Sequence, residues 1–211
     1  MPASQSHGFV WEEEVIRAYG LDPSSLKGYT RAHDIPADRN THAPGVNVSI
    51  KTAGGKSVDM GDVLRIWNET APGAQPLQLI VLFYTQGGVT QDDTTKTLRG
   101  ISTVDLTGRQ ADLFGYVSKE ELEAYVASVK AIPPGELTAE AREVYRGAAS
   151  KLNAKMGYLH VRPKVDSKNQ RRVQCSFPNF PAFLPSMDES CTINGVQIMK
   201  TIQSGRRLRN A

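Results

Sequence analysis

The sequence predicts an α/β (α+β) fold in which a mixed central sheet is flanked by helices. One observation is the alternation of β-branched and polar residues from Val46 to Lys51, which is typical of a strand with one apolar face. Another is the continuous apolar run from Leu77 to Thr85, which indicates a buried central strand. A third is the helical spacing of apolar residues over residues 6–20 and 58–70, before and between these strands.

The first helix is predicted from Ser6 to Gly20, with the glycine as its natural stop. Residues 12–14 are three glutamates in the first turns, where negative charge suits the helix dipole. Either all three form a solvated acidic surface, or Glu12 turns inward, because it lies three and four residues before Val15 and Ile16. The inward alternative makes Glu12 a candidate functional carboxylate.

Two adjacent antiparallel strands are predicted next, over residues 29–35 and 46–52. The segment between them contains Pro, Asn and Gly, which suits a connecting loop. Asp34 near the end of the first strand can then face Lys51 near the end of the second, and Ser49 shares the polar face with Lys51. An ordinary cross-strand ion pair is the alternative to a functional pair.

A helix is predicted over residues 58–70, with Ser57 as its N-cap, and it leads into the strand at 77–85. A further strand is predicted over residues 97–106. With one more early strand, the element order approaches αβββαβ. We therefore expect residues 1–110 to form the core of the protein.

Residues 111–211 are predicted to add helices and a basic β-hairpin to the same domain. Ser118 and Glu121 have the spacing of a capping box, which indicates a helix start. The Pro- and Phe-rich segment 177–185 is expected to pack over an edge of the core. The predicted elements are helices at 118–130 and 138–156, hairpin strands at 157–161 and 173–177, and a final strand or short helix at 192–202.

Composition excludes several classes of protein. The net charge of +3 does not identify a partner by itself. The two cysteines, Cys175 and Cys191, are too few and too far apart to indicate a disulfide scaffold or a zinc site. No apolar run approaches the roughly 20 residues of a membrane span, and the polar N-terminus does not resemble a signal peptide. We expect a soluble, intracellular protein without a membrane partner.

Positive charge gathers in one stretch, residues 151–172. It holds seven Lys or Arg residues and one acid, a net charge of +6 against +3 for the whole chain. Such a loop carries the donors that phosphates and base edges accept, and a solvated basic hairpin is the alternative. The candidate DNA-binding residues are Arg162, Lys164, Lys168, Asn169, Gln170, Arg171 and Arg172.

Asp34 and the run Ser49-Ile50-Lys51, together with the element order, resemble the PD-(D/E)XK (restriction-endonuclease-like) nuclease superfamily. Its pattern is Asp, a loop of variable length, and Glu-x-Lys. Ser49 replaces the second acid, and Ile35 follows Asp34 where the family pattern places Pro before the acid. A subset of the superfamily uses Ser-x-Lys and takes the missing carboxylate from a helix. Many members carry a glutamate in the first helix that points at the metal site, and Glu12 is similarly placed.

The resemblance implies a Mg²⁺ site, since Mg²⁺ prefers oxygen ligands and keeps several waters. Asp34 would be the main ligand, joined by the main-chain carbonyl of Ile50 and by Glu12, with Asp62 as a reserve carboxylate. Lys51 would orient or help to deprotonate the attacking water and offset charge on the phosphate. The implied catalytic set is Glu12, Asp34, Ser49 and Lys51.

The implied activity is that of a Mg²⁺-dependent endonuclease that cleaves double-stranded DNA. The segment from Asp166 to Arg172 also resembles a basic stretch of type II restriction-like nucleases of large DNA viruses, which implies sequence-specific cutting by a homodimer. Two alternatives stay open. One is a repair or junction-resolving nuclease, and the other is a catalytically inactive nucleic-acid-binding protein on the same fold.

Overall fold

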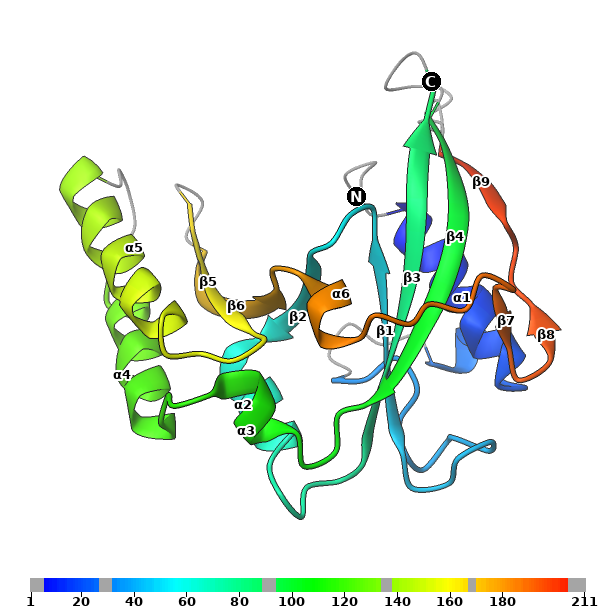
Figure 1. The fold of residues 1–211 in the computed structure, drawn as a ribbon, viewed down its shortest axis with the longest axis horizontal. Coiled ribbons are helices and arrows are strands. Elements are labelled where there is room, and N and C mark those ends of the chain that lie inside the picture. The colour runs from blue at the N-terminus through cyan, green and yellow to red at the C-terminus, as the bar shows by residue number, and fades with distance from the viewer. Residues whose placement is uncertain (1–5, 27–31, 89–93, 134–137, 167–169, 205–211) are drawn as a thin grey trace. The chain divides into compact units, whose positions relative to one another are not determined.

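The computed structural model describes residues 6–26, 32–88, 94–133, 138–166 and 170–204, which form two compact units (Figure 1). Unit 1 comprises Met1–Gly55, Gln75–Asp105 and Leu184–Ala211, and unit 2 comprises Lys56–Ala74 and Leu106–Phe183. Residues 56–74 belong with the later segment because their strand pairs with a strand of residues 171–177.

Unit 1 is built on a four-stranded mixed sheet, which confirms the predicted α/β class. The strand order is β1-β3-β4-β9, with β1 parallel to β3 and the other pairs antiparallel. The continuous apolar run therefore does form an interior strand, β3. The strands are β1 (Asn47–Ala53), β3 (Leu77–Gly87), β4 (Thr94–Asp105) and β9 (Thr201–Ser204).

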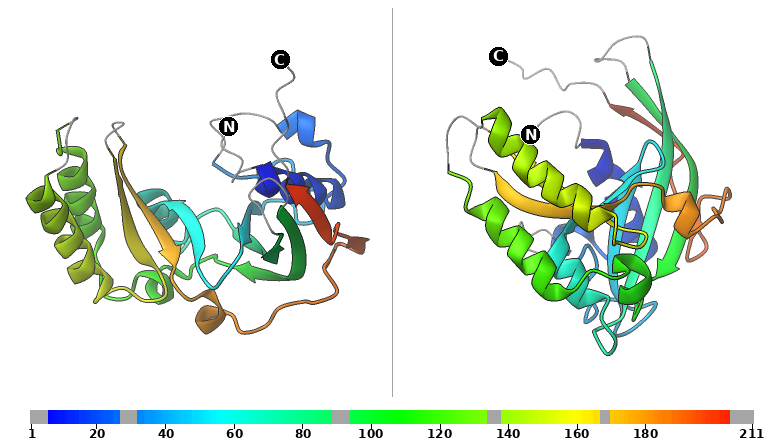
Figure 2. Two further views of the ribbon diagram at one scale, coloured as in Figure 1. Left: turned by 90° about the horizontal axis from the view of Figure 1, so that it is seen from above. Right: turned by 60° about the vertical axis from the view of Figure 1, so that its left-hand side comes forward.

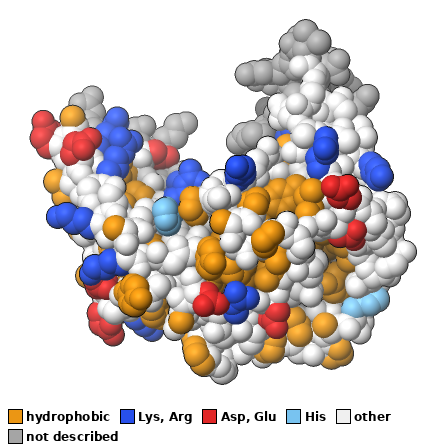
Figure 3. All heavy atoms as spheres, viewed as in Figure 1, with side chains coloured by type: hydrophobic (Ala, Val, Ile, Leu, Met, Phe, Trp, Pro, Cys, Tyr) orange, Lys and Arg blue, Asp and Glu red, His pale blue; other side chains and the backbone are white. Residues whose placement is uncertain are grey.

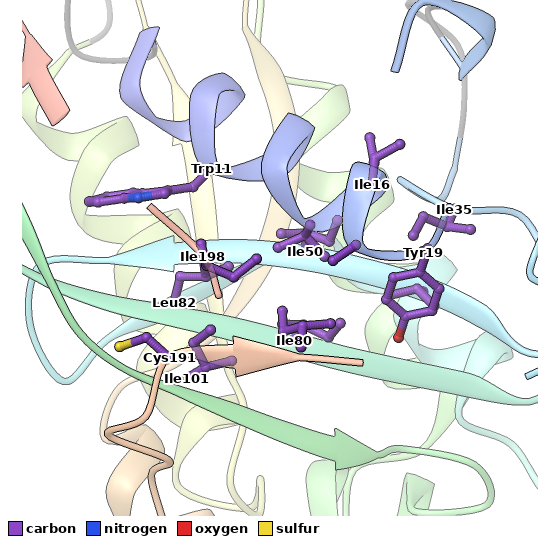
Figure 4. Packing of buried hydrophobic residues seen from close by; sticks show 14 of the residues in the cluster. Trp11, Ile16, Tyr19, Ile35, Ile50, Ile80, Leu82, Ile101, Cys191 and Ile198 are labelled. Carbon is purple, nitrogen blue, oxygen red and sulfur yellow. The ribbon is translucent and has the colours of Figure 1, made fainter. Parts of the chain in front are cut away.

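Helix α1 (Ser6–Ala18) covers one face of this sheet, as Figure 4 shows. Ile50 on β1 and Leu82 on β3 lie on that face because side chains alternate along a strand. Trp11 of α1 is fully buried against them, and its indole Nε1 donates to the carbonyl of Met199 at 2.9 Å. The predicted amphipathic helix is thus confirmed, and its buried face forms the core of unit 1.

The strand predicted over residues 29–35 is much shorter in the structure. Ile35 forms one antiparallel bridge with Val48 of β1, and residues 29–31 lie outside the described part of the chain. Pro36 follows at once, and a proline has no amide hydrogen with which to extend the pairing. The predicted antiparallel neighbour of β1 is therefore a bridge rather than a strand.

Unit 2 contains a three-stranded antiparallel sheet in the order β2-β6-β5. Its strands are β2 (Val58–Asp62), β5 (His160–Val165) and β6 (Arg171–Phe177). The predicted basic hairpin is thus present, but its strands extend into the predicted loop, so that Arg162, Lys164 and Arg172 lie on strands. Figure 2 shows helices α4 (Lys119–Lys130) and α5 (Ala139–Asn153) side by side on one side of this sheet. Both helices match their predictions, including the capping box of α4 and the threonine cap of α5.

The helix predicted over residues 58–70 is only half helical. Val58 and Met60 are buried and Asp59 is exposed, which is the period of a strand, and these residues belong to β2. Gly61 has a φ of +93°, a conformation that no α-helix contains. Helix α2 (Val63–Glu69) therefore starts later, with Asp62 rather than Ser57 as its N-cap.

The Phe-rich segment packs as expected. Phe177 and Phe180 are fully buried, and the Phe177 ring stacks on Phe183 with centroids 4.9 Å apart. None of the helices in the described ranges is long and apolar enough to cross a bilayer. The remaining elements are η1 (Pro23–Leu26), α3 (Gln110–Phe114), α6 (Phe180–Phe183), β7 (Thr192–Ile193) and β8 (Val196–Gln197).

We predict that Gly157→Ala destabilises unit 2 by at least the roughly 1–3 kcal/mol of an overpacked site. A Cβ at Gly157 would overlap the main-chain oxygen of Asp112, and backbone there cannot yield as a side chain can. Gly147→Ala in α5 is the control, because a Cβ at that position meets no atom within 4 Å. It should stabilise the helix by about 0.5–1 kcal/mol. Urea denaturation measures both, and equal midpoints for the two variants would contradict this packing.

Candidate active site

The main chain places Asp34 along the free edge of β1. The amides of Asp34 and Ile35 donate to the carbonyl of Val48 at 3.0 and 3.1 Å, and the Val48 amide donates back to Ile35 at 2.8 Å. The Asp34 carboxylate then accepts a hydrogen bond from the Ile50 amide at 2.5 Å. This charge-assisted bond holds one oxygen of Asp34, Oδ2, against the strand.

Lys51 faces this carboxylate, as the sequence predicts. Its Nζ lies 3.9 Å from Oδ2 of Asp34, and the two side chains are 28% and 23% exposed. This distance is at the limit of an ion pair. Because an ammonium group has three donors, Lys51 retains hydrogens for a further oxygen atom.

The main-chain carbonyl of Ile50 lies on the same edge of β1. In an extended strand the N–H and C=O of one residue point in the same direction, and the Ile50 amide points at Asp34. The predicted main-chain ligand is therefore on the correct side of the strand. The hydrogen bond from the Ile50 amide to Asp34 could not be predicted from the pattern of side chains, because the donor is a main-chain group.

Glu12 of α1 lies in the same electrostatic environment. Burial, and to a lesser extent the charge of Asp34, raises the pKa of Glu12 to about 7, although the charge of Lys51 acts in the opposite direction. This pKa shift is what an inward-facing Glu12 would show, and its place in the site stays a prediction. Glu13 and Glu14 instead form surface ion pairs with Arg17, at 3.1 and 2.9 Å.

Two other residues of the predicted site are placed differently. Ser49 is only 2% exposed, so its hydroxyl is buried although its Cα lies two positions from Lys51. Asp62 belongs to unit 2, where its carboxylate accepts the amide of Arg65 at 2.9 Å and caps α2. The site within unit 1 therefore consists of Glu12, Asp34, Lys51 and the backbone of Ile50.

The two carboxylates are few for a protein metal site. Across the described ranges, no group of three or more His, Cys, Asp or Glu side chains could hold a metal ion. Zinc and calcium sites generally use more protein ligands, whereas Mg²⁺ is often held by one or two carboxylates and several waters. The donor set of Glu12, Asp34 and the Ile50 carbonyl therefore fits Mg²⁺ best.

The predicted DNA-binding residues have unequal surroundings. The Arg171 guanidinium donates to four main-chain carbonyls at 2.6–2.9 Å, those of Ile132, Pro133, Asp166 and Gln170, so it clamps the end of α4 to the hairpin instead of facing a ligand. The Gln170 amide closes the hairpin on the carboxylate of Asp166 at 3.0 Å. Lys168 and Asn169 lie outside the described residues, and Arg162, Lys164 and Arg172 are on the sheet itself.

Comparison of the chain with family models, with curated proteins and with solved structures finds no match.

We predict that Glu12→Gln removes a pH dependence of stability. The folded state holds the Glu12 proton up to about pH 7, whereas the unfolded chain releases it near the ordinary pKa of 4.5. The free energy of unfolding of the wild type should therefore fall as pH rises through this window. In Glu12→Gln the fall should be missing, and the variant should be the more stable protein above pH 7.

Urea denaturation in EDTA over a pH series measures this effect. Glu14→Gln is the matched control, because it removes the same charge from the surface of the same helix. The inward placement of Glu12 would be contradicted by parallel pH profiles for the wild type and Glu12→Gln.

Proposed function

We propose that this protein is a Mg²⁺-dependent endonuclease that hydrolyses phosphodiester bonds in double-stranded DNA. The observation that carries the proposal is the pairing of Asp34 with Lys51 at the free edge of β1, with the carboxyl group of Glu12 in electrostatic interaction with both. Two acids beside a lysine can bind a metal ion and orient a water molecule, and these are the tasks of phosphodiester hydrolysis.

The element order supports the same reading. Counting the bridge segment at Ile35, the chain runs α1, bridge, β1, β2, α2, β3, which is the αβββαβ order of the PD-(D/E)XK superfamily. In this chain β2 belongs to the other sheet, so the likeness is one of order and not of a single sheet. A restriction-endonuclease-like core is part of the proposal for this reason.

The charges at the site favour a divalent cation. When Glu12 is ionised, Glu12 and Asp34 carry two negative charges against the single positive charge of Lys51. Burial and the charge of Asp34 raise the pKa of Glu12 to about 7, and a bound cation would favour its ionised form. Glu12, Asp34 and the Ile50 carbonyl would hold Mg²⁺. When bound, the ion supplies charge compensation at the phosphate and makes a coordinated water more acidic.

The protein side chains would divide the remaining work. The Ile50 amide fixes Oδ2 of Asp34, which leaves Oδ1 to face a ligand. The ammonium of Lys51 would donate to the attacking water or to a phosphate oxygen and would offset negative charge in the transition state. Ser49 is buried beneath this edge and would act only as a packing residue, so the second carboxylate comes from Glu12 on α1.

We predict that Lys51→Ala lowers the rate of Mg²⁺-dependent plasmid cleavage by about 10²- to 10⁴-fold, because a positioned donor at the reacting group is lost. DNA affinity should persist. Lys56→Ala is the control, since it removes an equal charge from an exposed position close by in the sequence. Digestion of a sequenced plasmid measures the rate, and wild-type cutting by Lys51→Ala would remove this lysine from the proposed site.

We predict that Glu12→Gln impairs cleavage far more than Glu14→Gln, because Glu12 interacts electrostatically with Asp34 and Lys51, whereas Glu14 is ion-paired with Arg17. Mg²⁺ or Ca²⁺ should also raise the melting temperature of the wild type but not that of Asp34→Asn. Equal cation stabilisation of these two proteins would exclude a metal at Asp34. If Asp62→Asn impairs cleavage and Glu12→Gln does not, Asp62 rather than Glu12 is the second carboxylate that cleavage requires.

The products of the same digestion define the type of nuclease. Discrete fragments are expected for sequence-specific cutting, with sedimentation of the intact protein reporting a homodimer. A smear, or cutting confined to branched substrates, would favour a repair or junction-resolving enzyme instead. Binding without cleavage in the presence of Mg²⁺ would favour an inactive nucleic-acid-binding protein.

A further inference from the structure

The sheet of unit 2 has two faces of different character. One face consists of apolar residues such as Val161, Val173 and Cys175, which are buried beneath α4 and α5. The register of β5 and β6 places six polar side chains together on the other face. We call these the polar face, which consists of His160, Arg162, Lys164, Arg172, Gln174 and Ser176. Ser176 is buried, and Asp59 and Asp62 of β2 lie opposite Ser176 and Gln174 on the same side of the sheet, away from the Lys164–Arg172 pair.

Positive charges lie side by side at the hairpin end of the polar face. Lys164 is directly opposite Arg172 in the antiparallel register, an arrangement in which like charges repel. Within the ranges that the structure describes, neither of the two forms an ion pair with an acid. Figure 3 shows Lys and Arg side chains grouped near this end of the sheet. The pairing is unfavourable in the isolated protein and would become favourable beside an anion.

Arg162 extends the row of charge along β5. It lies two residues from Lys164, so the two side chains emerge on the same face about 7 Å apart. Its guanidinium forms an ion pair with Asp59 at 3.1 Å, and both side chains are about half exposed. Such surface pairs are worth roughly 0–1 kcal/mol, so an anion can compete for Arg162.

Not every arginine of the hairpin lies on the polar face, because successive side chains of a strand point to opposite faces, and Arg171 is the example. Arg171 points to the helix-covered face, where its guanidinium donates to main-chain carbonyls of the segment that follows α4 and of the hairpin. Arg172, one residue later, is exposed on the polar face. Two adjacent arginines therefore have different tasks.

We propose that the polar face binds the phosphate backbone of duplex DNA through Lys164, Arg172 and Arg162. The choice of duplex DNA as the polyanion rests on the proposed function, whereas the placement of the charges does not. A row of cations at regular steps suits a row of phosphates. The six residues of the polar face include no large apolar side chain that could insert into a lipid layer.

The test measures the affinity of the full chain for a short duplex over a salt series in EDTA, so that neither cleavage nor the metal site contributes. Lys164→Gln, Arg172→Gln and Arg162→Gln should each reduce the slope of log affinity against log salt by about one unit. The loss should be the same for unrelated duplex sequences. Because these side chains are at the surface, the melting temperatures should stay near that of the wild type.

Two matched controls accompany these variants. Arg142→Gln removes one exposed positive charge from α5 and should leave the slope unchanged. Arg171→Gln should lower the melting temperature, because it breaks the clamp on α4, while the slope below that temperature stays at the wild-type value.

Three results would overturn the proposal. The first is a wild-type slope in the double variant of Lys164 and Arg172. The second is an equal loss of slope in Arg142→Gln, which would show that the slope depends on the net charge of the protein and not on the polar face. The third is a stronger dependence on Lys164 and Arg172 for vesicles containing anionic lipid, or for a polyglutamate peptide, than for DNA.

Failure of the proposed nuclease activity gives a different pattern. Lys51→Ala should keep the wild-type slope, because Lys51 belongs to the cleavage site of unit 1. A wild-type protein that never cuts DNA, combined with the slope losses described for Lys164 and Arg172, would overturn the activity and support the binding face.

Discussion

The parallel pairing of β1 with β3 is the constraint on which much of the molecule depends. Parallel neighbours cannot be joined by a tight turn, so the chain must leave the sheet between Ala53 and Leu77. In that excursion it forms β2 and α2, and β2 pairs with β6 in the second sheet. One pairing in unit 1 thus requires the connection from which unit 2 begins.

The same pairing leaves one edge of β1 open, and this edge carries the candidate site. β3 occupies the hydrogen-bonding groups on one side of β1, while Val48 and Ile50 present theirs on the other side to Ile35 and Asp34. Glu12 follows Trp11, whose buried indole fixes the rotation of α1 on the sheet, and its carboxyl group interacts electrostatically with Asp34 and Lys51. A core residue thereby positions a polar one.

The basic hairpin illustrates how alternation along a strand separates structural from solvent-facing residues. Arg171 and Arg172 are chemically identical and adjacent, yet one is fixed to main-chain carbonyls and the other faces the polar side of the sheet. Net charge counts both equally. Only their direction relative to α4 distinguishes a clamp from a contact available to an anion.

The sequence by itself determined the elements whose stability is local. The amphipathic pattern of α1, the apolar run of β3 and the capping box of α4 appear in the structure as predicted, because their signals lie within a few residues. The facing of Asp34 and Lys51 could also be predicted, since it follows from alternation and a short connecting segment.

The tertiary structure decided the rest. Val58–Asp62 forms a strand because its main chain pairs with β6. The local spacing of apolar residues predicted a helix there, since it contains no information about a partner strand more than 100 residues later. Ser49 became buried, and the packing of α1 through Trp11 brought Glu12 into electrostatic interaction with Asp34. These outcomes depend on contacts between segments far apart in the chain, and the energy of such contacts is absent from the pattern of any one segment.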